Sequence, residues 1–157
     1  MTNIYLTTLI DAPIDVCFDV ARDIDVHQLS TSKTKEKAIA GRTSGLCEEG
    51  DTVTWQAIHF GIKQKLTVRI AEMDRPYHFE DEMIKGVFSF MKHKHSFSRE
   101  LNKTKMTDEF MFKAPFGIFG IVAEKFFLKS YMTNFLKERN RTLKSIAESK
   151  SEKSVGS

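Results

Sequence analysis

Two adjacent segments in the middle of the chain alternate apolar and polar residues with a period of two. Residues 51–60 and 62–73 both show this alternation, and Gly61 lies between them. Such a pattern is typical of strands with one buried face. Folding the segments about Gly61 puts Trp55 opposite Leu66 on the apolar side of both strands. The pattern therefore predicts a β-hairpin with one buried face and one solvent-exposed face.

The rest of the first two thirds of the chain also favours strands. A second alternating pair is joined by a predicted turn at Asn102-Lys103, which pairs Leu101 with Thr104. Phe88 and Phe90 break the alternation of the first of these strands, which indicates a bulge near its start. Pro13 opens a short helix after the first strand, and a second short helix follows. The remaining strands are predicted at 4–10, 36–40, 77–84, 87–101 and 104–113, and the second helix at 24–29.

From residue 117 the spacing of apolar residues changes to threes and fours, which predicts one long helix over 117–147. A helix of this length buries its apolar stripe only by lying across a sheet. The order of elements therefore predicts an α+β helix-grip fold, in which a curved antiparallel sheet of six to seven strands surrounds the C-terminal helix. We expect one domain over 1–148 and a disordered polar tail over 149–157.

Amino-acid composition and charge reduce the number of function classes that fit the chain. The chain has 13 Phe against one Trp and three Tyr, and Phe fills space without needing a hydrogen-bond partner. The net charge of +3 is spread along the sequence and comes with no recognition motif, so we expect no nucleic-acid partner. No segment reaches the roughly 20 apolar residues of a membrane span, and no signal peptide is evident, so we expect a cytoplasmic protein.

Sequence motifs point away from several enzyme classes. The chain contains no glycine-rich phosphate loop, no GxSxG and no HExxH, and its two cysteines form no CxxC. Cys17 falls on the apolar face of the first predicted helix and is expected to be a buried thiol. We therefore expect no cofactor and no bound metal.

Short motifs along nearly the whole chain resemble a known superfamily. Ile10-Asp11-Ala12-Pro13, followed by a helix containing Val16-Cys17-Phe18, resembles the opening of START-like, or Bet v 1-like, polyketide cyclase and lipid-transport domains. The segments 79–88, 93–97 and 115–117 and the run Arg139-Asn140-Arg141 resemble an uncharacterised bacterial branch that binds ligands. The resemblance implies a helix-grip fold with a tunnel between sheet and helix, and it leaves the chemistry open.

The most distinctive residues are polar groups on faces expected to point inward. His93 and His95 share a strand face with Met91 and Phe97, and the predicted register puts His95 opposite Phe110 and Phe97 opposite Asp108. Asp81 alternates with apolar residues on the neighbouring strand. We expect Asp81, His93, His95 and Asp108 to cluster under the helix. Four interpretations remain open: a buried structural network, ligand orientation, acid–base catalysis and a metal site.

The leading hypothesis is a noncatalytic module that binds a small apolar or lipid-like molecule. The first alternative is a cyclase or dehydratase that uses His93 or His95 with Asp81 or Asp108. The second is an interaction protein with a closed cavity.

His59 is expected to be exposed at the end of the sheet, and Trp55 to be either core or cavity wall. Residues 118–122 can form a lid or pack as an ordinary helix start. The predicted ligand-binding residues are Trp55, Leu66, Phe79, His93, His95, Phe97, Asp108, Phe110, Phe112 and Ile121.

Overall fold

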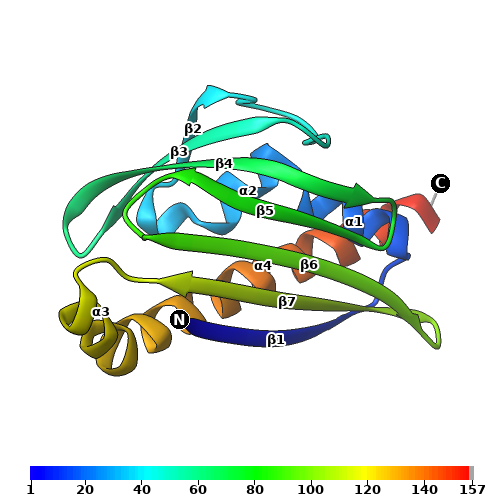
Figure 1. Ribbon diagram of the computed structural model, residues 1–157. Coiled ribbons are helices and arrows are strands. Elements are labelled where there is room, and N and C mark those ends of the chain that lie inside the picture. Colours follow the sequence, from blue (N-terminus) through cyan, green and yellow to red (C-terminus); the bar gives the residue numbers. More distant parts are fainter. Residues whose placement is uncertain (156–157) are drawn as a thin grey trace.

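The computed structural model describes residues 1–155, in which one antiparallel sheet curves around the C-terminal helix (Figure 1). The seven strands follow the order β1-β7-β6-β5-β4-β3-β2, and the two short helices after β1 cover part of the same concave face. This is the predicted helix-grip architecture. The elements are β1 (Thr2–Ile10), α1 (Ile14–Ala21), α2 (Ile24–Ser30), η1 (Ser32–Thr34), β2 (Lys37–Gly41), β3 (Thr52–His59), β4 (Ile62–Asp74), β5 (His78–Lys85), β6 (Phe90–Glu100), β7 (Lys103–Lys113), α3 (Gly117–Ala123), η2 (Glu124–Leu128) and α4 (Lys129–Val155).

Local sequence explains where the short helices begin. Pro13 is the N-cap of α1, where its missing N–H costs no helical hydrogen bond. The carboxylate of Asp23 caps α2 by accepting hydrogen bonds from the backbone N–H groups of Asp25 and Val26, at 2.8 and 3.3 Å. The N–H of Ile24 also bonds to the carbonyl of Gly45, which ties α2 to the loop before β3.

The β3–β4 hairpin has the predicted register. Trp55 lies opposite Leu66, and the turn residues Phe60 and Gly61 both have positive φ angles, of 53° and 74°. A two-residue turn of this kind matches the right-handed twist of the strands that it joins. The buried apolar residues of both strands consequently share the inner face of the hairpin; they include Val53, Trp55, Val68 and Ile70.

The predicted register between β6 and β7 is wrong by two positions. The turn is Leu101-Asn102, and it pairs Glu100 with Lys103. His95 therefore lies opposite Asp108. Leu101, which the predicted register paired with Thr104, is fully exposed at the turn. Because side chains alternate with a period of two, a shift of two positions changes every partner and leaves every inward face unchanged. In the corrected register Phe110 lies opposite His93, and Phe97 opposite Met106.

Two other boundaries also differ from the prediction. β6 begins at Phe90, so Phe88 belongs to the preceding loop and no strand bulge is needed. The C-terminal helix starts at Gly117 as predicted, passes through the π-helical turn η2, and continues to Val155. Most of the tail expected to be disordered is therefore helical, and residues 156–157 lie outside the described residues.

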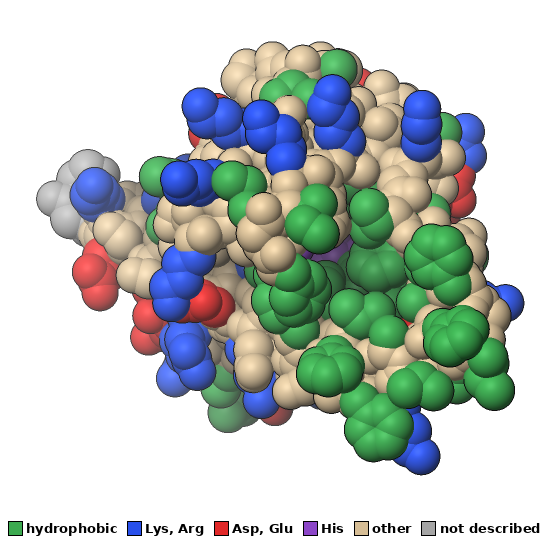
Figure 2. Space-filling model, turned by 90° about the vertical axis from the view of Figure 1, so that its left-hand side faces the viewer, with side chains coloured by type: hydrophobic (Ala, Val, Ile, Leu, Met, Phe, Trp, Pro, Cys, Tyr) green, Lys and Arg blue, Asp and Glu red, His purple; other side chains and the backbone are tan. Residues whose placement is uncertain are grey.

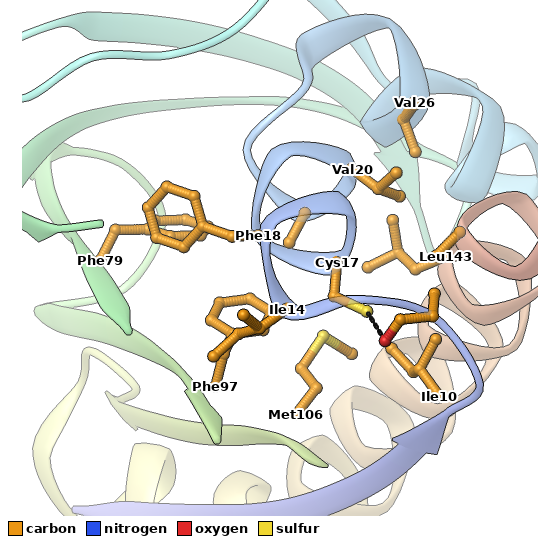
Figure 3. Close-up of a cluster of buried hydrophobic side chains, with 13 residues drawn as sticks. Ile10, Ile14, Cys17, Phe18, Val20, Val26, Phe79, Phe97, Met106 and Leu143 are labelled. Atoms are coloured by element: carbon orange, nitrogen blue, oxygen red, sulfur yellow. Dashed lines mark hydrogen bonds between the residues drawn. The ribbon is translucent and has the colours of Figure 1, made fainter. Parts of the chain in front are cut away.

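Buried side chains fill one end of the space between sheet and helices (Figure 3). Phe18 of α1 contacts Phe79 and Phe97 edge to face, with ring centroids 5.5 and 5.6 Å apart. Cys17 is buried beside them with a free thiol, as predicted. Of the residues labelled in Figure 3, only Phe79 also lines the cavity described below. This packed end holds the sheet against α1 and α4 and leaves the remaining space to a second group of residues.

Candidate functional site

A cavity of about 340 Å³ lies between the concave face of the sheet and α4. It opens at the end of the molecule opposite the packed end, where Figure 2 shows a hollow surrounded by apolar side chains with a histidine at its bottom. Its walls are mainly apolar and come from β3, β4, β6, β7 and α4. They include Val53, Trp55, Leu66, Val68, Met91, Phe110, Met132, Phe135 and Leu136.

The structure brings six of the predicted ligand-binding residues to this cavity. Trp55 is both core and wall, because it is 7% exposed, lines the cavity and stacks on His27 with ring centroids 4.2 Å apart. The full set at the cavity is Trp55, Leu66, Phe79, His93, His95 and Phe110.

The other four predicted residues do not line the cavity. Phe97 belongs to the packed end, and Phe112 is fully buried against Phe88 and Phe110. Asp108 is also fully buried, behind the histidines. Ile121 is 59% exposed on the outside of α3 and does not reach the cavity.

The predicted polar cluster forms across three neighbouring strands. Asp81 of β5, His93 and His95 of β6 and Asp108 of β7 all face inward. His93 Nε2 lies 2.8 Å from Asp108 Oδ1, and His95 Nε2 lies 3.1 Å from Asp81 Oδ2. The shortest contact of each histidine is thus with the carboxylate diagonal to it, and His95 Nδ1 also lies 3.4 Å from Oδ1 of the directly opposite Asp108. The two imidazole rings lie 3.8 Å apart, centroid to centroid.

Two further members of the cluster come from α4 and were missed in the sequence. Asn140 donates from Nδ2 to Asp108 Oδ2 at 2.7 Å, and Arg139 Nη1 lies 3.5 Å from Asp108 Oδ1. Both side chains are 3% exposed. The helical spacing of the sequence could have identified them. Arg139 and Asn140 are three and four positions from the apolar residues Leu136 and Leu143, so all four lie on the same side of the helix, the one that faces inward.

Burial and neighbouring charges shift the pKa values of the two histidines in opposite directions. Burial, together with the adjacent His95, lowers the pKa of His93 to about 4, so this ring is neutral at pH 7. Burial alone would lower the pKa of His95 as well, but Asp108 and Asp81 outweigh it and raise that pKa. Burial would raise the pKa of both carboxyl groups, yet hydrogen bonds from the histidines lower them. Arg139 and the protonated form of His95, which the raised pKa favours, together offset the charges of Asp81 and Asp108.

The tautomer of neutral His93 follows from its contact. Asp108 is ionised and accepts hydrogen bonds only, so the proton of His93 is on Nε2. The other nitrogen, Nδ1, has no hydrogen-bond partner within residues 1–155, and His93 lines the cavity. The cavity side of the cluster therefore offers two hydrogen-bond acceptors, the Nδ1 of His93 and the carboxylate of Asp81.

A second polar pair lies nearer the mouth and corrects the expectation that His59 is exposed. His59 is half-buried, and its Nδ1 lies 2.7 Å from the hydroxyl of Tyr131 on α4. Burial lowers the pKa of His59 and raises that of Tyr131, so both side chains are neutral at pH 7. Both line the cavity, and Phe60 packs on Tyr131 with ring centroids 4.5 Å apart. The pair joins the β3–β4 turn to the helix.

Asp81, His93 and His95 are also the residues best placed to hold a metal ion. One ligand atom from each lies within 4.8 Å of the others. The Nε2 atoms of both histidines are already engaged by Asp108 and Asp81, whereas the buried Nδ1 of His95 has no hydrogen bond within the described part of the chain and lies 3.4 Å from Asp108 Oδ1. A metal-free site stays our prediction.

Comparison with known proteins rests on structure alone. No protein-family model matches the chain, and no curated protein matches it. Among solved structures, TTHA0849 from Thermus thermophilus superimposes with a TM-score of 0.78 at 16% identity, over 96% of this chain and 99% of that one. A START superfamily protein from Mycobacterium smegmatis does so with a TM-score of 0.64 at 10% identity, over 96% and 97%. This chain has the START-like, or Bet v 1-like, fold.

A plant member of the same fold gives a similar result. Ginseng major latex-like protein 151 from Panax ginseng superimposes with a TM-score of 0.69 at 12% identity, over 93% of this chain and 97% of that one. At such identities the likeness establishes the helix-grip architecture and no shared site residue. Within residues 1–155, no helix is both long and apolar enough to cross a bilayer.

Proposed function

We propose that this protein binds a small, uncharged apolar molecule that carries a hydroxyl group. The observation behind the proposal is a cavity of about 340 Å³ whose apolar walls lead to a few converging polar groups. Binding sites for small molecules commonly have this construction and occupy about 300–1,000 Å³. Hydrophobic ligands are also typical of the START-like and Bet v 1-like fold.

The chemistry of the cluster favours a neutral ligand with a hydrogen-bond donor. Asp81 keeps its negative charge, and the Nδ1 of neutral His93 is an acceptor. A hydroxyl group can donate to either of them. A carboxylate at the same place would meet the charge of Asp81, and the guanidinium of Arg139 is already engaged with Asp108 and Asn140. An anionic head group is therefore disfavoured.

A matched pair of probes tests the proposal: dodecanol and dodecanoate have the same chain and differ in the head group. We expect dodecanol to bind at least about tenfold more tightly at pH 8, as one unfavourable buried contact predicts. Asp81→Asn removes the negative charge that repels a carboxylate, so it should reduce the ratio of dodecanol affinity to dodecanoate affinity. The control Glu80→Gln, on the other face of β5, should leave this ratio unchanged. Competition with a fluorescent hydrophobic probe measures both affinities. Failure of both probes to bind would overturn the cavity proposal, and tighter binding of dodecanoate would overturn the choice of head group.

One observation keeps an enzymatic role as the second candidate. His93 and His95 both line the cavity, so a bound molecule can reach them. His93, with a pKa of about 4, is a weak base at neutral pH. The raised pKa of His95 beside Asp81 favours its protonated form, which can donate a proton as a dehydratase requires. Turnover that is lost in His95→Gln while probe binding is kept would favour this role. The remaining alternative, an interaction protein with a closed cavity, does not agree with the open 340 Å³ cavity.

A further inference from the structure

The cavity opens at an end of the molecule that is unusually apolar. We call this the open end and define it by the residues around the mouth, 57–66, 83–91 and 113–132. Six large apolar side chains of its helical part are between 59% and 83% exposed: Phe116, Ile118, Phe119, Ile121, Phe126 and Phe127. Figure 2 shows many apolar side chains gathered around the hollow on this face of the molecule. A contiguous exposed apolar surface on a protein usually marks a docking site.

The start of the helix is anchored in a way that leaves these side chains outward. Gly120 packs so closely on the backbone that a Cβ atom there would lie 2.1 Å from the carbonyl oxygen of Pro115. The buried carboxylate of Glu124 accepts hydrogen bonds from the N–H of Ala114 and the hydroxyl of Thr2, both at 2.6 Å. One side of the helix start is thus fastened to β1 and to the end of β7, and its apolar residues project away from the sheet.

Charge at the open end has a single sign. Its only acidic residue is Glu124, which is 4% exposed. Six exposed lysines lie in the same segments, and within the described residues none of them forms an ion pair. They are Lys63, Lys65, Lys85, Lys113, Lys125 and Lys129.

We propose that the open end docks on an anionic membrane surface, with the aromatic residues of α3 and η2 entering the interfacial region and the lysines facing lipid head groups. Apolar side chains combined with basic ones are the composition of interfacial membrane anchors. A protein partner fits less well, because lysine is depleted from protein interfaces. Two copies joined at this end would bring lysines of like charge together.

The cavity mouth lies within the open end, which suggests a functional reason for membrane docking there. Phe60, Lys65, Pro115 and Leu128 line the cavity at the open end, so a docked protein presents the mouth to the bilayer. An apolar ligand can then pass between bilayer and cavity without crossing water. This last step rests on the proposed ligand binding, whereas the docking itself does not.

Vesicle flotation tests the docking. We expect the full chain to bind vesicles of equal parts phosphatidylcholine and phosphatidylglycerol at least about tenfold more strongly than pure phosphatidylcholine, with binding weakened by salt. Phe119→Ser/Phe126→Ser/Phe127→Ser should lower partitioning by at least about a hundredfold, because three aromatic side chains no longer leave water. The matched control Leu29→Ser/Tyr77→Ser/Leu101→Ser changes three exposed apolar residues outside the open end and should bind as the wild type does.

The outcomes separate docking from ligand binding. Absent vesicle binding, equal binding to both vesicle types, or a loss in the control variant as large as in the phenylalanine variant would overturn the docking proposal. A dimer that dissociates in the phenylalanine variant, without vesicle binding, would assign the surface to a second copy instead. The phenylalanine variant should still bind dodecanol in solution, since none of its three residues lines the cavity. Circular dichroism confirms that each variant is folded.

Discussion

Asp108 receives hydrogen bonds from a neighbouring strand and from the C-terminal helix at once. His93 donates to one of its oxygens and Asn140 to the other, while Arg139 lies beside them. The carboxylate is fully buried, so these contacts replace all of its water. Asp108 thereby links β6, β7 and α4 at the inner end of the cavity.

Removing this carboxylate should be costly. Asp108→Ala leaves the guanidinium of Arg139 buried without its counter-charge, and we expect the free energy of unfolding to fall by about 3–5 kcal/mol. Urea denaturation measures the loss. Glu109→Ala, which changes the exposed neighbour on the other face of β7, is the control and should cost less than about 0.5 kcal/mol. A loss below about 1 kcal/mol in Asp108→Ala would mean that the cluster does not depend on Asp108 for its charge balance.

The two histidines should make the free energy of unfolding fall on both sides of about pH 6.5, the ordinary pKa of histidine. His93 causes the fall on the acidic side, and His95 the fall on the alkaline side. The pKa of His93 is lowered in the fold, so the unfolded chain takes up more protons and stability falls as the pH drops from about 6.5 towards about 4. His59, whose pKa burial also lowers, acts in the same direction. The raised pKa of His95 stabilises the fold below pH 6.5, and this gain is lost as the pH rises through that pKa.

The measurement is the free energy of unfolding from urea curves between pH 4 and pH 8.5, where we expect a maximum near neutrality. His93→Gln should flatten the acidic side and His95→Gln the alkaline side. A wild-type curve that is level between pH 5 and pH 7 would contradict the assignment of the neutral ring to His93.

At the scale of elements, the turns determine which residues of the hairpins meet. The β6–β7 turn places Leu101 at a φ of 55° with its side chain in water, so the backbone conformation there is set by the strands and not favoured by the residue. The β3–β4 turn uses Gly61, which adopts a positive φ without cost. The β6–β7 turn is therefore recognisable only when the pairing of the strands is known.

Leu101→Gly should relieve this strain. We expect a gain of about 0.5–1 kcal/mol in the free energy of unfolding, since the released strain exceeds the extra entropy of glycine in the unfolded chain. Leu101→Ala keeps the Cβ atom and serves as the control, with no gain. A thermal melt of the three proteins is sufficient, and equal stability of the two variants would show that φ at this turn is unstrained.

The last turns of α4 show how an element extends beyond its apolar pattern. Residues 148–154 are polar, yet four of these seven are the good helix formers Glu and Lys, and all follow a helix that is already nucleated. Glu148 additionally accepts a hydrogen bond from the N–H of Asp11 at 3.0 Å, which fastens this stretch to the end of β1. Polarity alone is therefore a poor guide to where a long helix ends.

At the scale of the whole molecule, one end is filled and the other is hollow. The side chains of α1 occupy the space beneath the sheet near Phe79 and Phe97, whereas the space under Trp55 and Leu66 belongs to the cavity. Placing the cavity beside the open end brings ligand, mouth and proposed membrane surface together. The packed end supplies the stability that the hollow end lacks.

A larger side chain in the cavity should weaken ligand binding without substantially lowering the free energy of unfolding. Ala57→Leu adds three carbon atoms to the cavity wall, so we expect dodecanol affinity to fall at least about tenfold, while the free energy of unfolding stays within about 1 kcal/mol of the wild type or rises. Ile58→Ala on the outer face of β3 is the control for binding. Unchanged affinity in Ala57→Leu would place the probe somewhere other than this cavity.

The sequence by itself determined the helix-grip architecture and the inward faces of its strands. A period of two fixes which side of a strand each residue occupies, and this sufficed to place Asp81, His93, His95 and Asp108 in one cluster. It also sufficed for the β3–β4 hairpin, where Gly61 marks the turn.

Only the tertiary structure decided which inward residues line a cavity and which fill the core. Phe97 and Phe110 have the same pattern in the sequence, but α1 packs on the first and leaves the second beside empty space. Arg139 and Asn140 join the cluster because α4 crosses the sheet above Asp108. Such outcomes depend on how volumes from distant segments fit together, and no local period contains that information.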